Sequence, residues 1–215
     1  MKILNLYAGI GGNRKLWGNN HEVTAVENNP KIAKIYQDFF PNDKVIVADA
    51  HQYLLEHYKE FDFIWSSPPC PTHSVTNHFN FPRGNVRYPD FELWQEIVFL
   101  EHWFKGKWVV ENVKSYYPPL WKPQVLDRHY FWSNFHISSF RVERNFNVVN
   151  AHESSTKENV EKDVKILSKF HDIILPDYAT NKRLLLRNCV NPKIALHILN
   201  CAFKYKQISL CKEKK

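Results

Sequence analysis

The chain has 215 residues, enough for one α/β domain with a full core and small insertions, and none of its apolar runs approaches the roughly 18 residues of a membrane span. Its four cysteines form no Cys-x-x-Cys pair, which argues against a zinc site or a disulfide framework. The formal net charge of +7 suits a polyanionic partner, although a solvated basic surface explains it equally well. Because the chain opens directly on an apolar run, we expect no signal peptide. From the cysteine pattern we expect a cytoplasmic protein without a metal centre.

The first half of the chain alternates short apolar runs with helical patterns. The apolar runs at 2–7, 22–27, 43–47, 61–65 and 107–113 predict strands. Helices are predicted at 29–40, 52–57 and 90–103, the first of them with an Asn-Pro start signal. This alternation is typical of a mostly parallel sheet with helices on both faces.

The second half is less regular. Residues 129–135 and 137–142 are predicted to be further strands, antiparallel to their neighbours, and helices are predicted at 158–170 and from 193 to about 205. Between the fourth strand and the 90–103 helix, the segment 71–88 reads as a long loop. Loops of this length inside compact domains are usually functional or disordered.

Polar residues follow the first three strands. A glycine-rich stretch, Ala8 to Arg14, comes after the first strand and allows the backbone to approach a ligand closely. Arg14 occupies the third glycine position of a dinucleotide fingerprint, so a nicotinamide or flavin site fits poorly. Glu27 ends the second strand, where a carboxylate can accept hydrogen bonds from ribose hydroxyls, and Asp49 follows the third strand. Taken singly, Glu27 is equally well explained as an exposed strand-end acid and Asp49 as a helix cap.

The fourth strand runs into a turn that contains Pro68, Pro69, Cys70 and Pro71. Prolines restrict their own φ angle and the conformation of the preceding residue, so the turn holds Cys70 in few conformations. The carboxyl ends of parallel strands form the ligand-binding edge of open α/β sheets. Cys70 is therefore a candidate nucleophile, and a buried, unreactive cysteine is the alternative interpretation.

Together these stretches resemble the cytosine-5 DNA methyltransferases that depend on S-adenosylmethionine. The stretch Leu6 to Gly12 resembles the cofactor loop of that family, Ser67 to Cys70 its Pro-Cys motif, and Glu111 to Val113 its Glu-Asn-Val motif. The stretch from Arg187 to Ala195 is similar to the closing motif of the family. The resemblance covers about residues 3–203 and implies a Rossmann-like class I methyltransferase fold, with an antiparallel strand near one edge of the sheet.

The resemblance also implies the site residues. It assigns catalysis to Cys70, Glu111, Arg128 and His129. It assigns cofactor binding to Tyr7, Ala8, Gly9, Gly11, Gly12, Glu27, Asn28, Asp49, Ala50, Pro68, Asn188 and Cys189. Nucleic-acid contacts are assigned to Ser74, Arg83 and Arg87, in the loop that is expected to close over a flipped base.

The chain departs from the family in three places. The Arg-x-Arg strand of the family is here Asp127-Arg128-His129, so either His129 stands at the second arginine or Arg128 replaces one after a one-residue slip. Arg187 replaces the glycine of the closing motif, so the backbone geometry of that turn is expected to differ. A small insertion, about 143–183, stands in place of a target-recognition domain within a single catalytic domain.

The chemistry explains the residue types. Carbon 5 of cytosine becomes nucleophilic when a thiolate adds to carbon 6, and Cys70, activated by nearby positive charge, would supply that thiolate. Glu111 would donate to ring nitrogen 3 and accept from the exocyclic amine. Duplex DNA with a flipped cytosine is the expected partner. Three alternatives stay open: the same chemistry on RNA, one subunit of a split enzyme that needs a partner chain for recognition, and a non-catalytic DNA-binding module, which an intact Cys70 and Glu111 argue against.

Overall fold

The computed structural model describes residues 1–144, 146 and 156–203 of the chain, and in this part it contains one seven-stranded sheet. The strands are β1 (Lys2–Leu6), β2 (Glu22–Val26), β3 (Lys44–Ile46), β4 (Phe63–Ser66), β5 (Lys107–Val113), β6 (Gln124–Leu126) and β7 (His129–Ser133). The α-helices are α1 (Pro30–Phe39), α2 (Ala50–His57), α3 (Asn77–Asn80), α4 (Glu92–Trp103), α5 (Lys157–His171), α6 (Lys182–Arg187) and α7 (Pro192–Phe203). Short 3₁₀ turns follow α2 and α3, at Tyr58–Glu60 and Phe81–Arg83.

The strand order is β3-β2-β1-β4-β5-β7-β6. Neighbours from β3 to β5 are parallel, whereas β7 is antiparallel to both β5 and β6. The prediction of a mostly parallel sheet with one antiparallel strand near an edge is therefore confirmed. Helices connect β2 to β3, β3 to β4 and β4 to β5, whereas a long loop connects β1 to β2, and parallel neighbours need such long connections.

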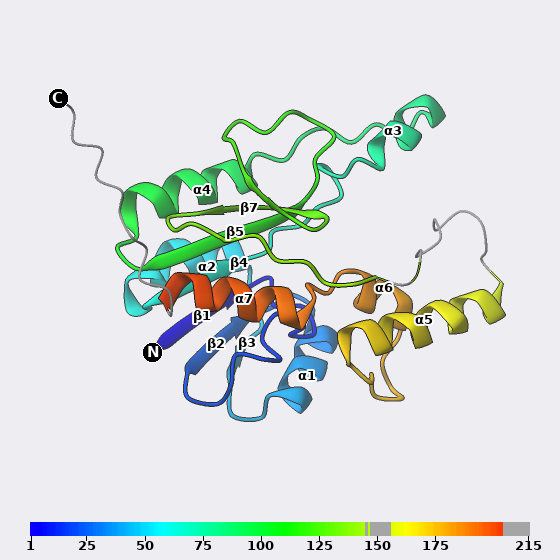
Figure 1. Ribbon diagram of the computed structural model, residues 1–215, viewed down its shortest axis with the longest axis horizontal. Helices are drawn as coiled ribbons and strands as arrows, with labels where there is room; N and C mark the ends of the chain where they lie inside the picture. The colour runs from blue at the N-terminus through cyan, green and yellow to red at the C-terminus, as the bar shows by residue number, and fades with distance from the viewer. Residues whose placement is uncertain (145, 147–155, 204–215) are drawn as a thin grey trace.

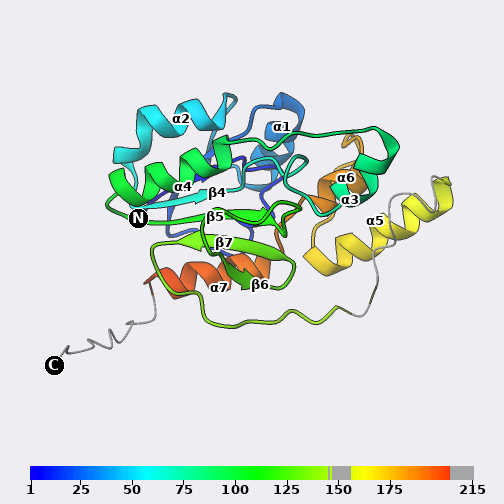
Figure 2. The ribbon, with the colours of Figure 1, turned by 90° about the horizontal axis from the view of Figure 1, so that it is seen from above.

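Alternate side chains of the central strands build two apolar layers. Leu4, Ile64 and Val110 face α2 and α4, as part of one buried cluster. The residues next to them in sequence point to the opposite face and pack against α7. Trp65, for example, lies in the second cluster with Ile194 of α7. Figure 2 shows α2 and α4 on one side of the sheet and α7 on the other. The predicted helices on both faces are thus present.

Three predictions about individual segments need correction. Residues 137–142 form no strand; Ile137 is buried in the α7 cluster and Phe140 stacks on His197, so these apolar residues pack on a helix instead of pairing with a strand. The sheet edge is β6, which the sequence pattern did not predict. The predicted loop 71–88 contains α3 and a 3₁₀ turn. The last helix reaches Phe203 in the described residues, and positions 204 and 205 of the prediction lie outside them.

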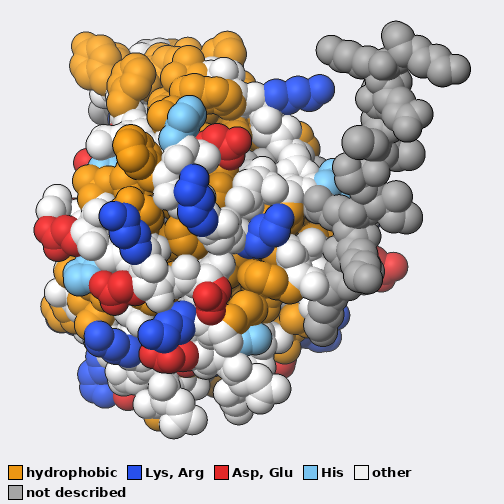
Figure 3. Space-filling view, turned by 90° about the vertical axis from the view of Figure 1, so that its left-hand side faces the viewer, with side chains coloured by type: hydrophobic (Ala, Val, Ile, Leu, Met, Phe, Trp, Pro, Cys, Tyr) orange, Lys and Arg blue, Asp and Glu red, His pale blue; other side chains and the backbone are white. Residues whose placement is uncertain are grey.

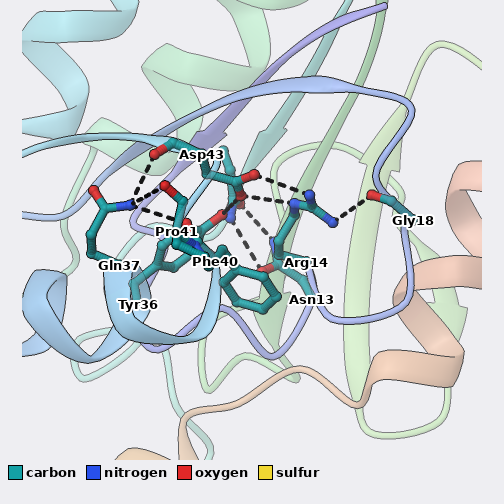
Figure 4. Close-up of polar contacts among 9 residues, drawn as sticks. Asn13, Arg14, Gly18, Tyr36, Gln37, Phe40, Pro41 and Asp43 are labelled. Atoms are coloured by element: carbon teal, nitrogen blue, oxygen red, sulfur yellow. Dashed lines mark hydrogen bonds and ion pairs between the residues drawn. The ribbon is translucent and has the colours of Figure 1, made fainter.

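The start of β3 is fixed to the glycine-rich loop by a buried ion pair (Figure 4). The Arg14 guanidinium donates to both carboxylate oxygens of Asp43, at 2.8 and 3.0 Å, and to the Gly18 carbonyl at 2.8 Å. Tyr36 donates its hydroxyl to the same carboxylate at 2.9 Å. The Arg14 and Asp43 side chains are only 4 % and 3 % exposed, so each charge depends on its partner. This pair explains why an arginine stands where a dinucleotide fingerprint has glycine.

No helix in residues 1–144 or 156–203 combines the length and the apolar character that crossing a bilayer requires.

Arg14→Met should lower the free energy of unfolding by about 3–5 kcal/mol, because it leaves the Asp43 charge buried and unpaired. Urea denaturation of both proteins measures this difference. The matched control is Lys34→Met, which breaks the exposed Lys34–Asp38 pair and should change stability far less. Equal effects of the two substitutions would contradict the assigned role of the buried pair.

Candidate active site

The carboxyl ends of the central parallel strands meet at one edge of the sheet. β1 pairs with both β2 and β4, and β4 pairs with β5. In Figure 1 these strands point away from the end of the molecule that carries the N-terminus, toward the end where α3, α5 and α6 lie. The glycine loop, Glu27, the proline-rich turn and Glu111 all follow or end these strands, so the fold gathers them at this edge.

Glu27 fixes the glycine loop. Its two carboxylate oxygens accept backbone N–H groups, from Gly9 at 3.0 Å and from Asn29 at 2.9 Å. Gly9 has a φ of +54°, and a Cβ atom built there would meet no other atom within 4 Å. Gly9 therefore turns an open face of its backbone outward, while Glu27, 9 % exposed, stays beside it as an acceptor.

Gly11 and Gly12 are required for packing. A Cβ on Gly11 would lie 2.3 Å from the Phe40 ring, and one on Gly12 would lie 2.9 Å from the Cys189 sulfur. The segment after α6 thus closes against the glycine loop and brings the late Cys189 to the early part of the chain. Burial raises the pKa of the Cys189 thiol to about 12, which makes it a packing group at neutral pH.

The remaining predicted cofactor residues surround this loop to different degrees. Asp49 is exposed and caps α2, its carboxylate accepting the Gln52 N–H at 2.8 Å, so the capping interpretation of this residue is confirmed, and cofactor binding stays a prediction. Asn28 and Asn188 are exposed as well. Those that are buried or partly buried are Tyr7, Ala8, Ala50 and Pro68.

A buried carboxylate that sequence reasoning missed joins these loops. Glu96 of α4 is fully buried; its Oε1 accepts the Tyr7 hydroxyl at 2.6 Å and the His51 Nδ1–H at 3.2 Å, and its Oε2 accepts the Ser66 hydroxyl at 2.5 Å. Tyr7 precedes the glycine loop, Ser66 precedes the catalytic turn, and His51 lies near the start of α2. The signal in the sequence was a glutamate on the apolar stripe of Leu93, Ile97 and Leu100.

This network shifts the pKa values of two of its members, Tyr7 and His51. Burial, followed by the charge of Glu96, raises the pKa of the Tyr7 hydroxyl, which therefore remains a hydrogen-bond donor. The hydrogen bond to Glu96 raises the pKa of His51 above its usual 6.5, with smaller contributions from Glu92 and Asp49. His51 is only 13 % exposed, so its proton is shared with a buried acceptor.

The contribution of His51 to stability should depend on pH. Because the folded pKa is raised, the His51–Glu96 pairing stabilises the fold fully below the unfolded pKa of about 6.5 and is lost as pH rises through the folded value. The stability difference between the wild type and His51→Gln should thus be largest below about pH 6.5 and shrink as the pH rises above that value. Urea denaturation below and above that pH tests it. A difference that grows with pH would contradict the pairing.

The proline-rich turn is tied to β5. Asn112 donates its side-chain N–H to the Pro68 carbonyl at 3.0 Å, and the Cys70 carbonyl accepts the N–H groups of His73 and Ser74 at 3.0 and 2.9 Å. These bonds hold Cys70 at the end of β4, half-buried. Since β4 and β5 are neighbours, Cys70 lies close enough to Glu111 for the two groups to interact electrostatically.

The electrostatics of Cys70 differ from the expectation. Burial raises the pKa of the Cys70 thiol, and the Glu111 carboxylate raises it further. Arg87 lowers that pKa, as the sequence led us to expect of a nearby positive charge, but its effect is the smaller. In the free protein the thiol is therefore protonated at neutral pH; Arg87 acts in the expected direction, and burial and Glu111 outweigh it.

The Glu111 side chain has His129 beside it. β5 pairs with β7 so that Val113 lies opposite His129, which places His129 and Glu111 diagonally on the same face. His129 Nε2 is 3.7 Å from Glu111 Oε1, and His129 Nδ1 is buried with no hydrogen-bond partner in the described part of the chain. Arg128 is exposed, at the turn before β7. Of the two candidates, Arg128 and His129, it is His129 that lies beside the Glu111 carboxylate.

The three predicted nucleic-acid residues lie in the segment 71–88, which contains α3 and is called the α3 segment below. Ser74 forms a bridge with Ser115, which fastens the start of this segment to the chain after β5. Arg87 is exposed and donates to the Pro71 carbonyl at 3.5 Å, next to the catalytic turn. Arg83 is exposed in the 3₁₀ turn after α3. The segment is thus attached at its start and exposed along its second half.

Glu111→Gln should lower the pKa of Cys70, because it removes the negative charge that disfavours the thiolate, and should speed alkylation of Cys70 by iodoacetamide at neutral pH. Arg87→Gln should act in the opposite direction. Peptide-level mass spectrometry of the labelled protein, carried out in a Cys211→Ser background, follows Cys70 alone. Identical pH profiles for all three proteins would show that neither charge reaches the thiol.

The sheet and the residues at its carboxyl edge define a Rossmann-like methyltransferase. A sequence model described as C-5 cytosine-specific DNA methylase matches residues 1–117, and the chain belongs to this family. Membership makes the chain a cytosine-5 methyltransferase and implies S-adenosylmethionine as the methyl donor. A search among curated proteins gave no match.

Two solved structures share the fold over nearly the whole chain. The Entamoeba histolytica methyltransferase EhMeth is 12 % identical, with a TM-score of 0.57, over 95 % of this chain and 98 % of that one. A triple mutant of Spodoptera frugiperda DNMT2 is 16 % identical, with a TM-score of 0.59, over 94 % of this chain and 99 % of that one. At these identities the likeness establishes the fold, and it confirms the predicted methyltransferase architecture.

The residues at the edge fit the cofactor that the family implies. The open backbone at Gly9 permits close approach of a ligand, and Glu27 has carboxylate lone pairs beyond the two N–H groups that it accepts. The exposed Asp49 and Asn28 add polar groups at the neighbouring strand ends.

Proposed function

We propose that the chain transfers a methyl group from S-adenosylmethionine to carbon 5 of cytosine in DNA, through a covalent adduct with Cys70. The observation that carries the proposal is that Cys70 and Glu111 lie near the ends of the neighbouring strands β4 and β5, which the Asn112–Pro68 hydrogen bond ties together. A nucleophile and an acid held on neighbouring strands can act on one base from two sides.

Each catalytic side chain has one role in this proposal. The Cys70 thiolate adds to carbon 6 of cytosine, and the electron pair of the 5,6 double bond moves to carbon 5. Glu111 binds ring nitrogen 3 and the exocyclic amine, where it stabilises the charge that develops. When bound, the cofactor supplies a methyl group on a sulfonium to carbon 5. Loss of the carbon-5 proton to a base and departure of the thiolate then restore the aromatic ring.

The electrostatics of the free site agree with this order of events. Burial, and after it the Glu111 charge, raises the pKa of the Cys70 thiol in the free protein and so favours its protonated form. To donate a hydrogen bond to ring nitrogen 3, Glu111 must take up a proton, and the neutral carboxyl no longer disfavours a charge on the thiol, so substrate binding itself would favour the thiolate. We assign His129 to hold the Glu111 carboxylate in place, and the exposed Arg128 to contact the substrate strand.

The cofactor is assigned to the glycine loop and the strand ends beside it. Glu27 would accept the ribose hydroxyls, Asp49 would accept from the adenine amine, and Gly9 would offer its open backbone. The remaining contacts are those named from the sequence: Tyr7, Ala8, Gly11, Gly12, Asn28, Ala50, Pro68, Asn188 and Cys189.

DNA is the proposed substrate because the matching family is described as a DNA methylase and the chain is basic. The exposed arginines of the α3 segment, Arg83 and Arg87, would contact the strand or fill the gap left by the flipped base, with Ser74 beside them. Since a small insertion replaces a recognition domain, we propose a short or relaxed target site, or recognition with the help of a partner chain.

Cys70→Ser should abolish methyl transfer while leaving cofactor affinity unchanged, because serine at this position is a far weaker nucleophile. Transfer of labelled methyl groups to a DNA duplex and to an RNA duplex of matched sequence measures activity, and calorimetry measures cofactor binding. With 5-fluorocytosine in the substrate, the wild type should form a covalent adduct that survives denaturation.

Three outcomes would overturn parts of this proposal. An adduct that persists in Cys70→Ser would place the nucleophile elsewhere. Transfer to the RNA duplex alone would replace DNA as the substrate. Activity that appears only when a second chain is added would make the protein one subunit of a split enzyme.

A further inference from the structure

Helices α5 and α6 enclose a groove of about 860 Å³ outside the catalytic centre. Its lining residues come from the two helices and the residue before α6: Lys157, Val160, Glu161, Val164, Lys165, Asn181, Lys182, Arg183, Leu184 and Arg187. Five of these ten are Lys or Arg and one is Glu, so the lining residues carry an excess of positive charge around a mostly apolar surface. Val160, Val164 and Leu184 supply apolar side chains between the charges.

The groove is built on a fixed scaffold. Leu167 of α5 and Leu186 of α6 are buried in one cluster with Ile10 of the glycine loop and Ile35 of α1. Across the two helices Arg183 and Asp163 form an ion pair of 2.6 Å, with side chains 16 % and 15 % exposed. The walls of the groove are therefore held by both apolar packing and a partly buried charge pair.

The basic side chains are only partly compensated. Asp163 neutralises Arg183, and the exposed Asp177 lies 3.8 Å from Lys182. Arg187 is close to both Arg183 and Arg128, whose charges, after burial, lower its pKa. Like charges gathered in this way repel one another in the free protein, and an anion placed among them relieves that repulsion.

The groove adjoins the catalytic edge. Arg187 at its end is electrostatically coupled to Arg128, and Arg128 precedes His129, whose Nε2 lies 3.7 Å from Glu111. Figures 1 and 2 both show α5 and α6 at the end of the molecule toward which the carboxyl ends of the parallel strands point. A line of basic groups thus leads from the catalytic acid into the groove.

The charged side chains on the opposite side of the molecule are of mixed sign, unlike those of the groove. Figure 3 shows the side that carries the N-terminus, where Lys and Arg side chains are interspersed with Asp and Glu. Exposed lysines there, such as Lys59 and Lys105, stand before the amino ends of β4 and β5 and provide a comparison for the groove. The basic concave surface at the catalytic end is therefore more than a general excess of positive charge.

We propose that the α5–α6 groove binds the sugar–phosphate backbone of the nucleic-acid substrate, in the flank of the target cytosine. Phosphates along each strand match a row of Lys and Arg groups, and neutralising them releases counterions. The apolar side chains of the groove suit sugar or base surfaces between the phosphates. This inference rests on the proposed function, because it takes the nucleic acid to be the substrate of the adjacent site.

The test uses a fluorescent duplex made only of adenine and thymine, so binding is measured without any target cytosine. Lys165→Gln/Arg187→Gln should weaken binding and reduce the slope of log affinity against log salt by about 0.9 for each phosphate that the variant no longer neutralises. Lys59→Gln/Lys105→Gln removes the same charge on the opposite side and should leave the slope unchanged. If the first double variant unfolds at a lower temperature, Lys157→Gln/Lys165→Gln takes its place.

The outcomes separate the groove from the proposed function. Equal slopes for the groove variant and the control would overturn the groove proposal, even if methyl transfer is observed. A reduced slope in a protein that transfers no methyl group would retain the groove and remove the proposed activity. Polyglutamate that displaces the duplex at an equal concentration of charges would assign the groove to an acidic protein partner and overturn the inference. On cytosine-containing duplex, the groove variant should raise KM for the duplex without changing cofactor affinity.

Discussion

The fully buried Glu96 carboxylate constrains the arrangement of the whole catalytic edge. A carboxylate without water is costly unless its oxygens accept hydrogen bonds, and here the donors come from three different segments: Tyr7, His51 and Ser66. Each donor lies within a few residues of a strand end that carries site residues. The glycine loop, the start of α2 and the proline-rich turn can therefore move apart only if Glu96 loses partners, which ties the proposed cofactor and catalytic loops to one point in the core.

A second constraint concerns the Cys70 thiol, whose reactivity depends on the charges around it. Burial raises the pKa of the Cys70 thiol and the nearby Glu111 carboxylate raises it further, so the proposed nucleophile is suppressed in the free protein. In the proposed mechanism the substrate rebalances these charges, and until it binds the thiol is protected from unwanted alkylation and oxidation. Burial makes the effect larger, because charges interact more strongly where water is excluded.

The parts of the fold predicted from the sequence are those with a local signal. The parallel strands were visible as apolar runs, and their polar ends could be placed together because parallel strands share one carboxyl edge. The strand at 124–126 was missed, and 137–142 was wrongly assigned to a strand, because pairing with β7 or packing on α7 depends on distant residues. The Glu96 network joins residues up to 89 positions apart, and the contact of His129 with Glu111 depends on the β5–β7 register. Local patterns carry neither kind of information. The cofactor and catalytic assignments themselves remain predictions.

The late part of the chain is attached to the cofactor loop by several independent contacts. Cys189 packs on Gly12, Ile10 shares a buried cluster with Leu167 and Leu186, and Lys15 pairs with Asp172 at 2.7 Å. A separate recognition domain would need an interface of its own to hold its position relative to the catalytic edge. Here α5 and α6 bury Leu167 and Leu186 in the same apolar cluster as Ile10 of the glycine loop, which fixes their position. A small chain can therefore hold the proposed substrate groove and the proposed cofactor loop in register with one core.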